Sequence, residues 1–225
     1  MSRSSHYSKF FSLIVLLFLA VGSKGIAQDF LKVSVKGGIN LATLFGDTYS
    51  NLGPRTGLVL GLAGELPYKD NWLFQAEIFY AQEGARNPNY DFSSFSDVVY
   101  DQKLIYDFVN VPLLIKYELK DQLTLLFGPQ IGFRISAKES RKIKAGTPAP
   151  SDTSAGTRDL SNRIKVVYPS LVAGAEYALT EQLKAQARVG FSMFDIVKRN
   201  AGDSEGTYPL ILQIGISYHI FQVDL

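Results

Sequence analysis

The sequence predicts an all-β protein, an eight-stranded antiparallel up-and-down transmembrane β-barrel with short periplasmic turns and long extracellular loops. Three observations predict this fold. Apolar and polar residues alternate along eight segments with a period of two, which is the period of a β-strand. The apolar face of these segments carries no charge, as a surface in contact with lipid requires. The connections alternate between tight turns and long loops, an asymmetry typical of outer-membrane barrels.

The first four predicted strands span 31–41, 57–66, 72–82 and 105–117. The outward positions are apolar on all four: Leu31, Val33, Val35, Ile39 and Leu41; Leu58, Leu60, Leu62 and Leu66; Trp72, Phe74, Ala76, Ile78 and Tyr80; Val109, Val111, Leu113, Ile115 and Tyr117. The fourth strand loses its phase near Tyr106 and Phe108, which predicts a β-bulge there.

The last four predicted strands span 123–136, 166–178, 183–193 and 210–221. The strand 123–136 alternates most clearly. Its outward residues are Leu123, Leu125, Phe127, Pro129, Ile131, Phe133 and Ile135, and its inward residues are Thr124, Leu126, Gly128, Gln130, Gly132, Arg134 and Ser136. The final strand turns an apolar face outward with Leu210, Leu212, Ile214, Ile216, Tyr218 and Ile220.

Tight turns are expected at 67–71, 118–122 and 179–182, and long loops at 42–56, 83–104, 137–165 and 194–209. The loop 137–165 is rich in Ser, Thr, Ala, Gly and Pro and has no apolar period, so we expect it to be mobile.

Alternation alone does not say whether the apolar face points outward, because a lipocalin-like soluble barrel shows the same period with this face inside. Side-chain volume favours the outward direction, since the narrow interior of eight strands cannot hold so many bulky residues. Aromatic residues also cluster at the strand ends, as the two membrane interfaces require. Tyr68 and the four predicted interfacial aromatics, Trp72, Tyr117, Tyr177 and Tyr218, lie near the short turns, and Tyr80, Phe108, Phe133, Tyr168, Phe191 and Phe194 lie near the long loops.

The first 27 residues have the features of a cleaved secretory signal peptide, and residues 28–225 form the predicted barrel. Arg3 and Lys9 precede an apolar stretch that is shorter than the about 20 residues of a helical span. Small residues at Gly25 and Ala27 suit cleavage before Gln28, although an uncleaved anchor has the same composition. We therefore expect an integral protein of the bacterial outer membrane, in contact with outer-membrane lipid.

The composition argues against several functions. The chain lacks cysteine, so it has no disulfide, thiol nucleophile or Cys-ligated metal, and its net charge of +2 gives no reason to expect nucleic acid. His219 is the only histidine after the signal peptide, and it falls near the periplasmic end of the last strand. A lipid-modifying hydrolase needs a histidine and a serine together near the outer leaflet. We expect no catalytic residues, no metal and no cofactor, although a carboxylate such as that of Glu83 could replace the histidine as a base.

The inward face carries charges of both signs, which can pair inside the lumen. They are Lys36, Glu65, Glu77, Lys116, Arg134, Glu176, Lys184 and Arg188. Such a network is either a structural plug, because unpaired buried charge is costly, or a functional site. A continuous polar lumen would instead make a narrow pore for ions or small solutes, although eight strands leave little free bore.

The runs 37–40 (GGIN), 106–117 (YDFVNVPLLIKY) and 127–132 (FGPQIG) resemble the PorT-like outer-membrane β-barrel family of Bacteroidetes. The resemblance implies a barrel over nearly all of the mature chain and a role accessory to protein secretion or surface assembly. The family motifs are structural, so they transfer no functional residue. The last strand, with Gln213, Gly215, Tyr218 and Ile220, also resembles a signal for the barrel-assembly machinery, although the chain continues to Leu225.

A protein partner is expected to bind through the loops 83–104 and 137–165. The first loop carries Tyr90, Phe92, Phe95 and Tyr100, which form either a binding surface or a cover over the barrel mouth. The second is rich in Lys and Arg, which are either solvated or in contact with lipid phosphates or a partner's acidic surface. From the sequence we thus expect a non-enzymatic protein with a structural or interaction role.

Overall fold

The computed structural model describes residues 30–46, 52–91, 98–147, 154–198 and 206–224, and every regular element in these ranges is a strand. The strands are β1 (Phe30–Phe45), β2 (Gly53–Lys69), β3 (Trp72–Asp91), β4 (Val99–Lys120), β5 (Leu123–Ala145), β6 (Gly156–Asp159), β7 (Val167–Ala178), β8 (Leu183–Phe191) and β9 (Tyr208–Asp224). Within the described ranges, no helix has the length and apolar character to cross a membrane. The predicted signal peptide lies outside them.

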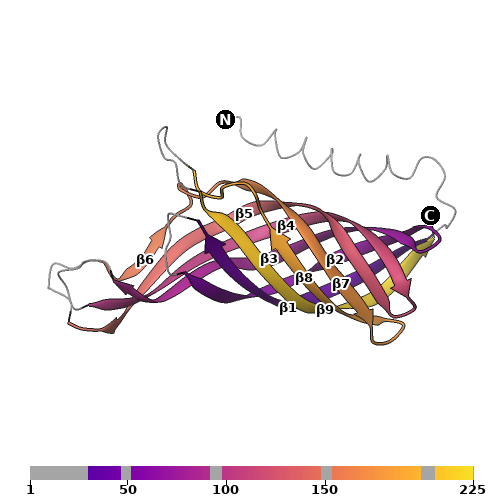
Figure 1. The fold of residues 1–225 in the computed structure, drawn as a ribbon, viewed down its shortest axis with the longest axis horizontal. Coiled ribbons are helices and arrows are strands. Elements are labelled where there is room, and N and C mark those ends of the chain that lie inside the picture. The colour runs from indigo at the N-terminus through magenta and orange to yellow at the C-terminus, as the bar shows by residue number, and fades with distance from the viewer. Residues whose placement is uncertain (1–29, 47–51, 92–97, 148–153, 199–205, 225) are drawn as a thin grey trace.

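Eight of these strands close into a ring in which every neighbouring pair is antiparallel (Figure 1). β1 pairs with β2 on one side and with β9 on the other, and the pairing of β4 with β5 completes the closure. β6 lies outside the ring and pairs only with the outer part of β5. The predicted eight-stranded up-and-down barrel is therefore confirmed, with β6 as an addition.

The apolar face points outward along the whole barrel. Leu60 is 68% exposed and Phe127 is 56% exposed, whereas the intervening positions of the same strands are buried or half-buried. The inward positions of β1 to β4 and β7 to β8 include seven of the eight predicted charged residues. Because a protein in water would hide this apolar face, the structure excludes the soluble alternative.

Three strands extend far beyond the length that a membrane requires. β3, β4 and β5 have 20, 22 and 23 residues, against the roughly 9–11 residues of a transmembrane strand. We call the outer parts of these strands, 84–91, 99–107 and 136–145, together with β6, the outer arm; they project past the other strands at the end opposite the C-terminus (Figure 1). The prediction of long loops at 83–104 and 137–165 is wrong for these residues. Strands outside the membrane need no lipid-facing apolar side, so the charge-free outward face that predicts the other strands is absent there.

The predicted irregularity near Phe108 is present, but it lies mainly in the neighbouring strand. The β4–β5 register shifts between Asp107 and Phe108, and Ile135 of β5 is the extra residue. β4 keeps its phase, so Tyr106 and Phe108 point inward and are buried. Phe108 and Tyr168, 0% and 1% exposed, are therefore interior residues, and their predicted place in the outer aromatic girdle is wrong.

Candidate functional site: a filled lumen and an outer arm

Seven of the eight predicted charged residues meet in one network across the periplasmic half of the lumen. The two centres of this network are Glu77 and Lys116. Lys36 Nζ donates to Glu77 Oε2 at 2.5 Å, and Arg188 donates to both Glu77 oxygens at 2.8 and 2.6 Å. Arg188 also contacts Glu176 at 3.3 Å, which joins the two centres.

Lys116 closes the other half of the network. Its Nζ donates to Glu176 Oε2 at 2.5 Å, to Gln75 Oε1 at 2.9 Å and to Glu65. Lys184 contacts the same Glu65 at 3.2 Å. These groups come from six strands and almost all are buried, so opposite charges compensate one another across the whole width of the barrel.

Arg134 is not part of this network. It lies at the outer end of the barrel beside the extra residue of β5, and it is only half-buried. In the β4–β5 register Arg134 lies opposite Phe108, which points inward, so Arg134 keeps its place on the inward side of β5 but lies beyond the charge network.

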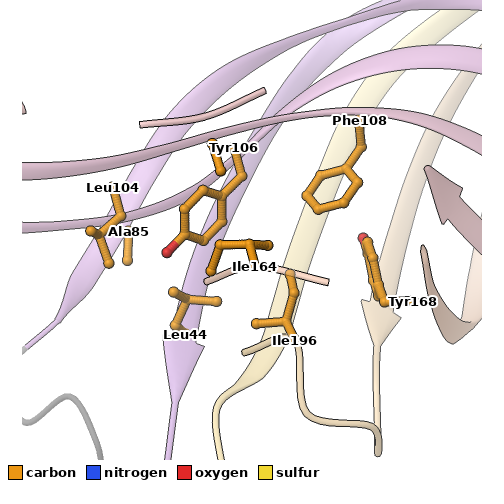
Figure 2. Close-up of a cluster of buried hydrophobic side chains, with 9 residues drawn as sticks. Leu44, Ala85, Leu104, Tyr106, Phe108, Ile164, Tyr168 and Ile196 are labelled. Carbon is orange, nitrogen blue, oxygen red and sulfur yellow. The ribbon is translucent and has the colours of Figure 1, made fainter. Parts of the chain in front are cut away.

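The outer half of the lumen is closed by apolar side chains (Figure 2). We call this cluster the outer plug; its buried members are Leu44, Ala85, Leu104, Tyr106, Phe108, Ala137, Ile164, Tyr168 and Ile196. Ile164 and Ile196 come from the segments that connect strands, and these segments form an isolated β-bridge. The rings of Phe108 and Tyr168 pack edge to face with centroids 4.8 Å apart.

A single carboxylate lies at the base of the outer plug. Glu83 is 2% exposed; it accepts hydrogen bonds from Asn110 Nδ2 at 2.8 Å and from the Tyr168 hydroxyl at 2.7 Å. A cavity of about 20 Å³, room for about one water molecule, touches Glu83 and Arg188 between the plug and the charge network. The described side chains thus fill the lumen at two successive levels.

The outer arm is held together by polar pairs of its own. Arg86 Nε donates to Asp101 Oδ1 at 2.8 Å, and this hydrogen bond holds the pKa of Asp101 below its usual range. On the inner side of the arm, Arg141 Nε donates to Glu139 at 2.7 Å, and the guanidinium lies 4.9 Å from the ring centroid of Tyr90. The arm is thus an ordered sheet over its described length.

The aromatic residues of the predicted loop 83–104 lie in different environments. Tyr100 is buried at 1% exposure, and Tyr90 is half-buried against Arg141. Phe92 and Phe95 lie outside the described residues. The four interfacial aromatics predicted near the short turns, Trp72, Tyr117, Tyr177 and Tyr218, are all exposed on the outer face there, and Trp72 packs on Tyr117 with centroids 4.8 Å apart.

His219 lies near the short-turn end of β9, opposite Ser34 of β1, and its backbone N–H donates to Gln182. Glu83 lies in the other half of the barrel. Within the described ranges, no group of three or more His, Asp or Glu residues is arranged to hold a metal ion.

A closed ring of antiparallel strands with a charge-free apolar exterior, aromatic residues near the short turns and a polar interior defines an integral β-barrel of the bacterial outer membrane. The family comparison agrees with this class. A family model described as "Outer membrane protein beta-barrel domain" matches residues 26–198, and the chain belongs to that family.

Several solved barrels are similar to this chain. Neisserial surface protein A is 10% identical, with 84% of this chain and 97% of that chain covered and a TM-score of 0.49. The attachment invasion locus protein Ail of Yersinia pestis, crystallised with the heparin analogue sucrose octasulfate, is 13% identical, with 86% and 99% covered and a TM-score of 0.45. A major outer membrane protein of Thermus thermophilus is 16% identical, with 84% and 99% covered and a TM-score of 0.45. No curated protein sequence matches the chain.

Sequence reasoning missed the outer plug and the glutamines of the charge network. Gln75 is buried between Lys116 and Glu77 and bonds to both, but an uncharged inward residue gave no signal of a network. The sequence does contain a signal for the plug. Leu104, Tyr106 and Phe108 repeat with a period of two on the inward face, which indicates an apolar interior as readily as a change of phase.

Proposed function

We propose that this protein is a closed outer-membrane barrel, without conducting or catalytic activity, that presents the outer arm to a protein partner at the cell surface. The observation that carries the proposal is the outer arm itself. β4 and β5 continue as a paired sheet for about ten residues past the ends of β7 and β8, or about 30 Å of strand. A barrel that served only as a membrane anchor needs no such extension.

The filling of the lumen supports the non-conducting part of the proposal. A solute that entered from outside would have to displace the outer plug and then break the ion pairs around Glu77 and Lys116. Each step separates groups that are almost completely buried, so both are costly.

The arrangement of titratable groups supports the absence of catalysis. The described base candidates, Glu83 and His219, lie in opposite halves of the barrel, and Glu83 is engaged with Asn110 and Tyr168 beneath the plug. An enzyme that acts on outer-leaflet lipid needs its base in hydrogen-bond reach of a nucleophile exposed to that leaflet. The resemblance to the PorT-like barrels of Bacteroidetes supports a more specific role for the protein, as an accessory to protein secretion or surface assembly.

The test removes the part of the outer arm formed by the tips of β3 and β4 and keeps the barrel. Residues 88–101 are replaced by Asn-Gly, which joins Asn87 to its cross-strand partner Gln102 through a two-residue hairpin turn. Chemical crosslinking in native membranes, followed by mass spectrometry, identifies the proteins bound to the wild type. We expect the main crosslinked partner to be lost from the shortened variant.

The matched control changes a tight turn at the end of the barrel opposite the outer arm. The double substitution D70N/N71G alters the tight β2–β3 turn, where Asp70 has a positive φ of 50°, and leaves every strand in place. This control should retain the partner. Equal crosslinking by all three proteins would contradict the role of the arm.

Two further measurements address the other functions. In planar bilayers we expect no stepwise conductance from the wild-type protein, and steady unitary openings would replace this proposal with a pore. Mass spectrometry of outer-membrane lipid from cells with and without the protein should give identical acyl patterns. A difference that disappears with Glu83→Gln or His219→Ala would make the protein an enzyme.

A further inference from the structure

One sector of the barrel carries a concentration of positive charge at its outer rim. In the segments 133–138, 158–167 and 191–198, six basic residues face two acidic ones, a net charge of +4. We call five of these residues the basic rim: Arg134, Lys138, Arg163, Lys165 and Lys198. The sixth, Arg158, lies opposite Glu139 in the β5–β6 ladder.

Backbone hydrogen bonds bring the three segments together. Arg134 N–H donates to Val166 O at 2.8 Å, which fixes β5 beside the segment before β7. Lys165 N–H donates to Ile196 O at 2.8 Å, and Lys198 N–H donates to Arg163 O at 2.7 Å. The basic side chains therefore lie on neighbouring stretches of backbone, at the spacing of adjacent strands, about 5 Å.

The side chains of this sector divide between the plug and the exterior. Ile164 is 1% exposed and belongs to the outer plug, whereas its neighbour Arg163 is exposed and Lys165 is half-buried. Lys138 and Lys198 are exposed. The exposed members Lys138, Arg163 and Lys198 thus make the basic rim available to a ligand outside the barrel.

The environment of Asp159 reflects this charge. Its Oδ1 accepts the Ser161 N–H at 2.6 Å, and this bond, together with the nearby charges of Arg134 and Lys138, holds its pKa below the usual range. Asp195 accepts the backbone N–H groups of Val197 and Thr207. Both carboxylates are therefore partly engaged with backbone.

The described basic residues on the outer part of β2, β3 and β4 have oxygen partners in their own sector. Arg55 donates to the backbone oxygen of Glu83 at 2.8 Å, and Arg86 and Lys103 both contact Asp101. The net charge of +4 counted above belongs to the side formed by β5, β7 and β8. A uniform ring would indicate general attraction to an anionic surface, whereas one basic sector indicates a localised site.

The basic rim borders directly on the lipid-facing surface. Ile135, Val166, Met193 and Phe194 are 58%, 51%, 66% and 57% exposed, and all four lie in the same three segments. An occupant that satisfies both surfaces must carry anionic groups on apolar chains. A soluble phosphate or an acidic protein surface matches only the basic part.

We propose that the basic rim is a binding site for the phosphate groups of an outer-leaflet lipid whose acyl chains lie against Ile135, Val166, Met193 and Phe194. This site adjoins the base of the outer arm, which contributes Lys138, and it differs from the arm in the chemistry of its partner. Its bound lipid would hold the connecting segments that carry Ile164 and Ile196 against the mouth of the barrel.

The test compares lipids that differ only in phosphate. Purified wild-type protein in detergent is titrated with bisphosphorylated lipid A, and bound lipid is counted by native mass spectrometry. The comparison ligand is the dephosphorylated lipid with the same acyl chains, and inorganic phosphate is the competitor. We expect tight retention of the phosphorylated lipid, weak retention of the other, and no competition by millimolar phosphate.

The variants test whether the charge is responsible. The triple substitution R163Q/K165Q/K198Q should weaken binding on the order of 100-fold, since each basic group near anionic lipid contributes about fivefold. The charge-conserving triple R163K/K165R/K198R should bind within a few-fold of the wild type. The control K69Q/K120Q/K142Q removes the same charge from exposed positions elsewhere and should leave binding unchanged.

Gel mobility before and after boiling verifies that each variant is folded. Equal binding by wild type and R163Q/K165Q/K198Q overturns the proposal, as does an equal loss in K69Q/K120Q/K142Q. Equal retention of the dephosphorylated lipid would show that acyl chains alone bind. Competition by inorganic phosphate would assign the rim to a soluble anion, and displacement by polyglutamate would assign it to an acidic protein.

Discussion

Removal of one carboxylate from the charge network is the most direct test of the filled lumen. Glu77 accepts hydrogen bonds from Lys36, from both terminal nitrogens of Arg188 and from Gln75, and its side chain is 0% exposed. Glu77→Gln keeps the shape of the side chain, removes its charge and places an amide N–H₂ among cations. We expect this substitution to destabilise the barrel strongly.

The magnitude follows from what remains around position 77. Arg188 keeps its contact with Glu176 at 3.3 Å, whereas the Lys36 side chain is 1% exposed and loses its paired carboxylate. Breaking a buried ion pair by removal of one partner costs about 3–5 kcal/mol, because the other charge stays desolvated. We expect a loss of about this size in the free energy of unfolding.

The assay uses the only tryptophan of the chain. Trp72 is 46% exposed on the lipid-facing side near a short turn, so its fluorescence changes when the barrel leaves the bilayer. Urea titrations in phosphatidylcholine vesicles, carried out in both folding directions, then give the free energy of unfolding. Glu181→Gln, at an exposed turn position, is the control and should change this value by at most about 0.5 kcal/mol.

A double substitution separates charge from shape. Lys36→Met combined with Glu77→Gln removes the cation that the single change leaves unpaired, so the double variant should be more stable than the sum of the two single effects predicts. A loss below about 1 kcal/mol for Glu77→Gln, or strict additivity in the double variant, would refute the reasoning that the network is compensated as one unit.

Three other predictions test where the lipid-facing side of the barrel lies in the membrane, how the outer plug packs and which side of the membrane the outer arm is on. Ile214→Arg should cost about 2–4 kcal/mol in the same vesicle titration and Ile220→Arg only about 0–1, because the first lies near mid-bilayer and the second near the periplasmic interface; equal costs would misplace the membrane. Gly132→Ala should destabilise by about 1–3 kcal/mol, since its Cβ would lie 2.4 Å from the ring of Tyr168, whereas Gly190→Ala makes only a 3.8 Å contact and should be tolerated; the reverse order would contradict the plug geometry. Protease added to whole cells should cut between β5 and β6 and leave a heat-modifiable barrel; protection in whole cells together with cleavage from the periplasm would invert the topology.

The membrane part of the fold could be predicted because lipid imposes a rule on every strand. A charged side chain at mid-bilayer is costly, so the face that contains Leu60 and Phe127 had to be free of charge, and the period of two followed from that face. The pairing of Lys36 with Glu77 was not predictable in detail. Only the shared inward face was, since register and barrel closure decide which inward charges meet.

The outer arm could not be predicted for the same physical reason. Above the membrane the strands are surrounded by water, which does not require an apolar outer face. The residues that extend β3, β4 and β5 therefore resemble loop residues in composition. Their strand structure depends on cross-strand pairs such as Arg86 with Asp101, which are non-local and weak individually. Ser136 was misplaced by one extra residue, because a bulge changes the side on which a side chain lies without changing composition.

The two levels of the lumen connect the barrel to the surfaces outside it. A charge network can fill a barrel with residues from the strands alone, as Glu77 and Lys116 show, so it is independent of the connecting segments. The outer plug is different, because Ile164 and Ile196 reach it from segments whose exposed neighbours form the basic rim. A ligand bound at the rim therefore acts on the same backbone that closes the mouth, whereas a partner bound to the outer arm acts on strands that continue down to Glu83 and Lys116. The effect of phosphorylated lipid on the stability of the barrel should accordingly change when residues of the basic rim are substituted. It should be the same with and without substitutions in the Glu77 network.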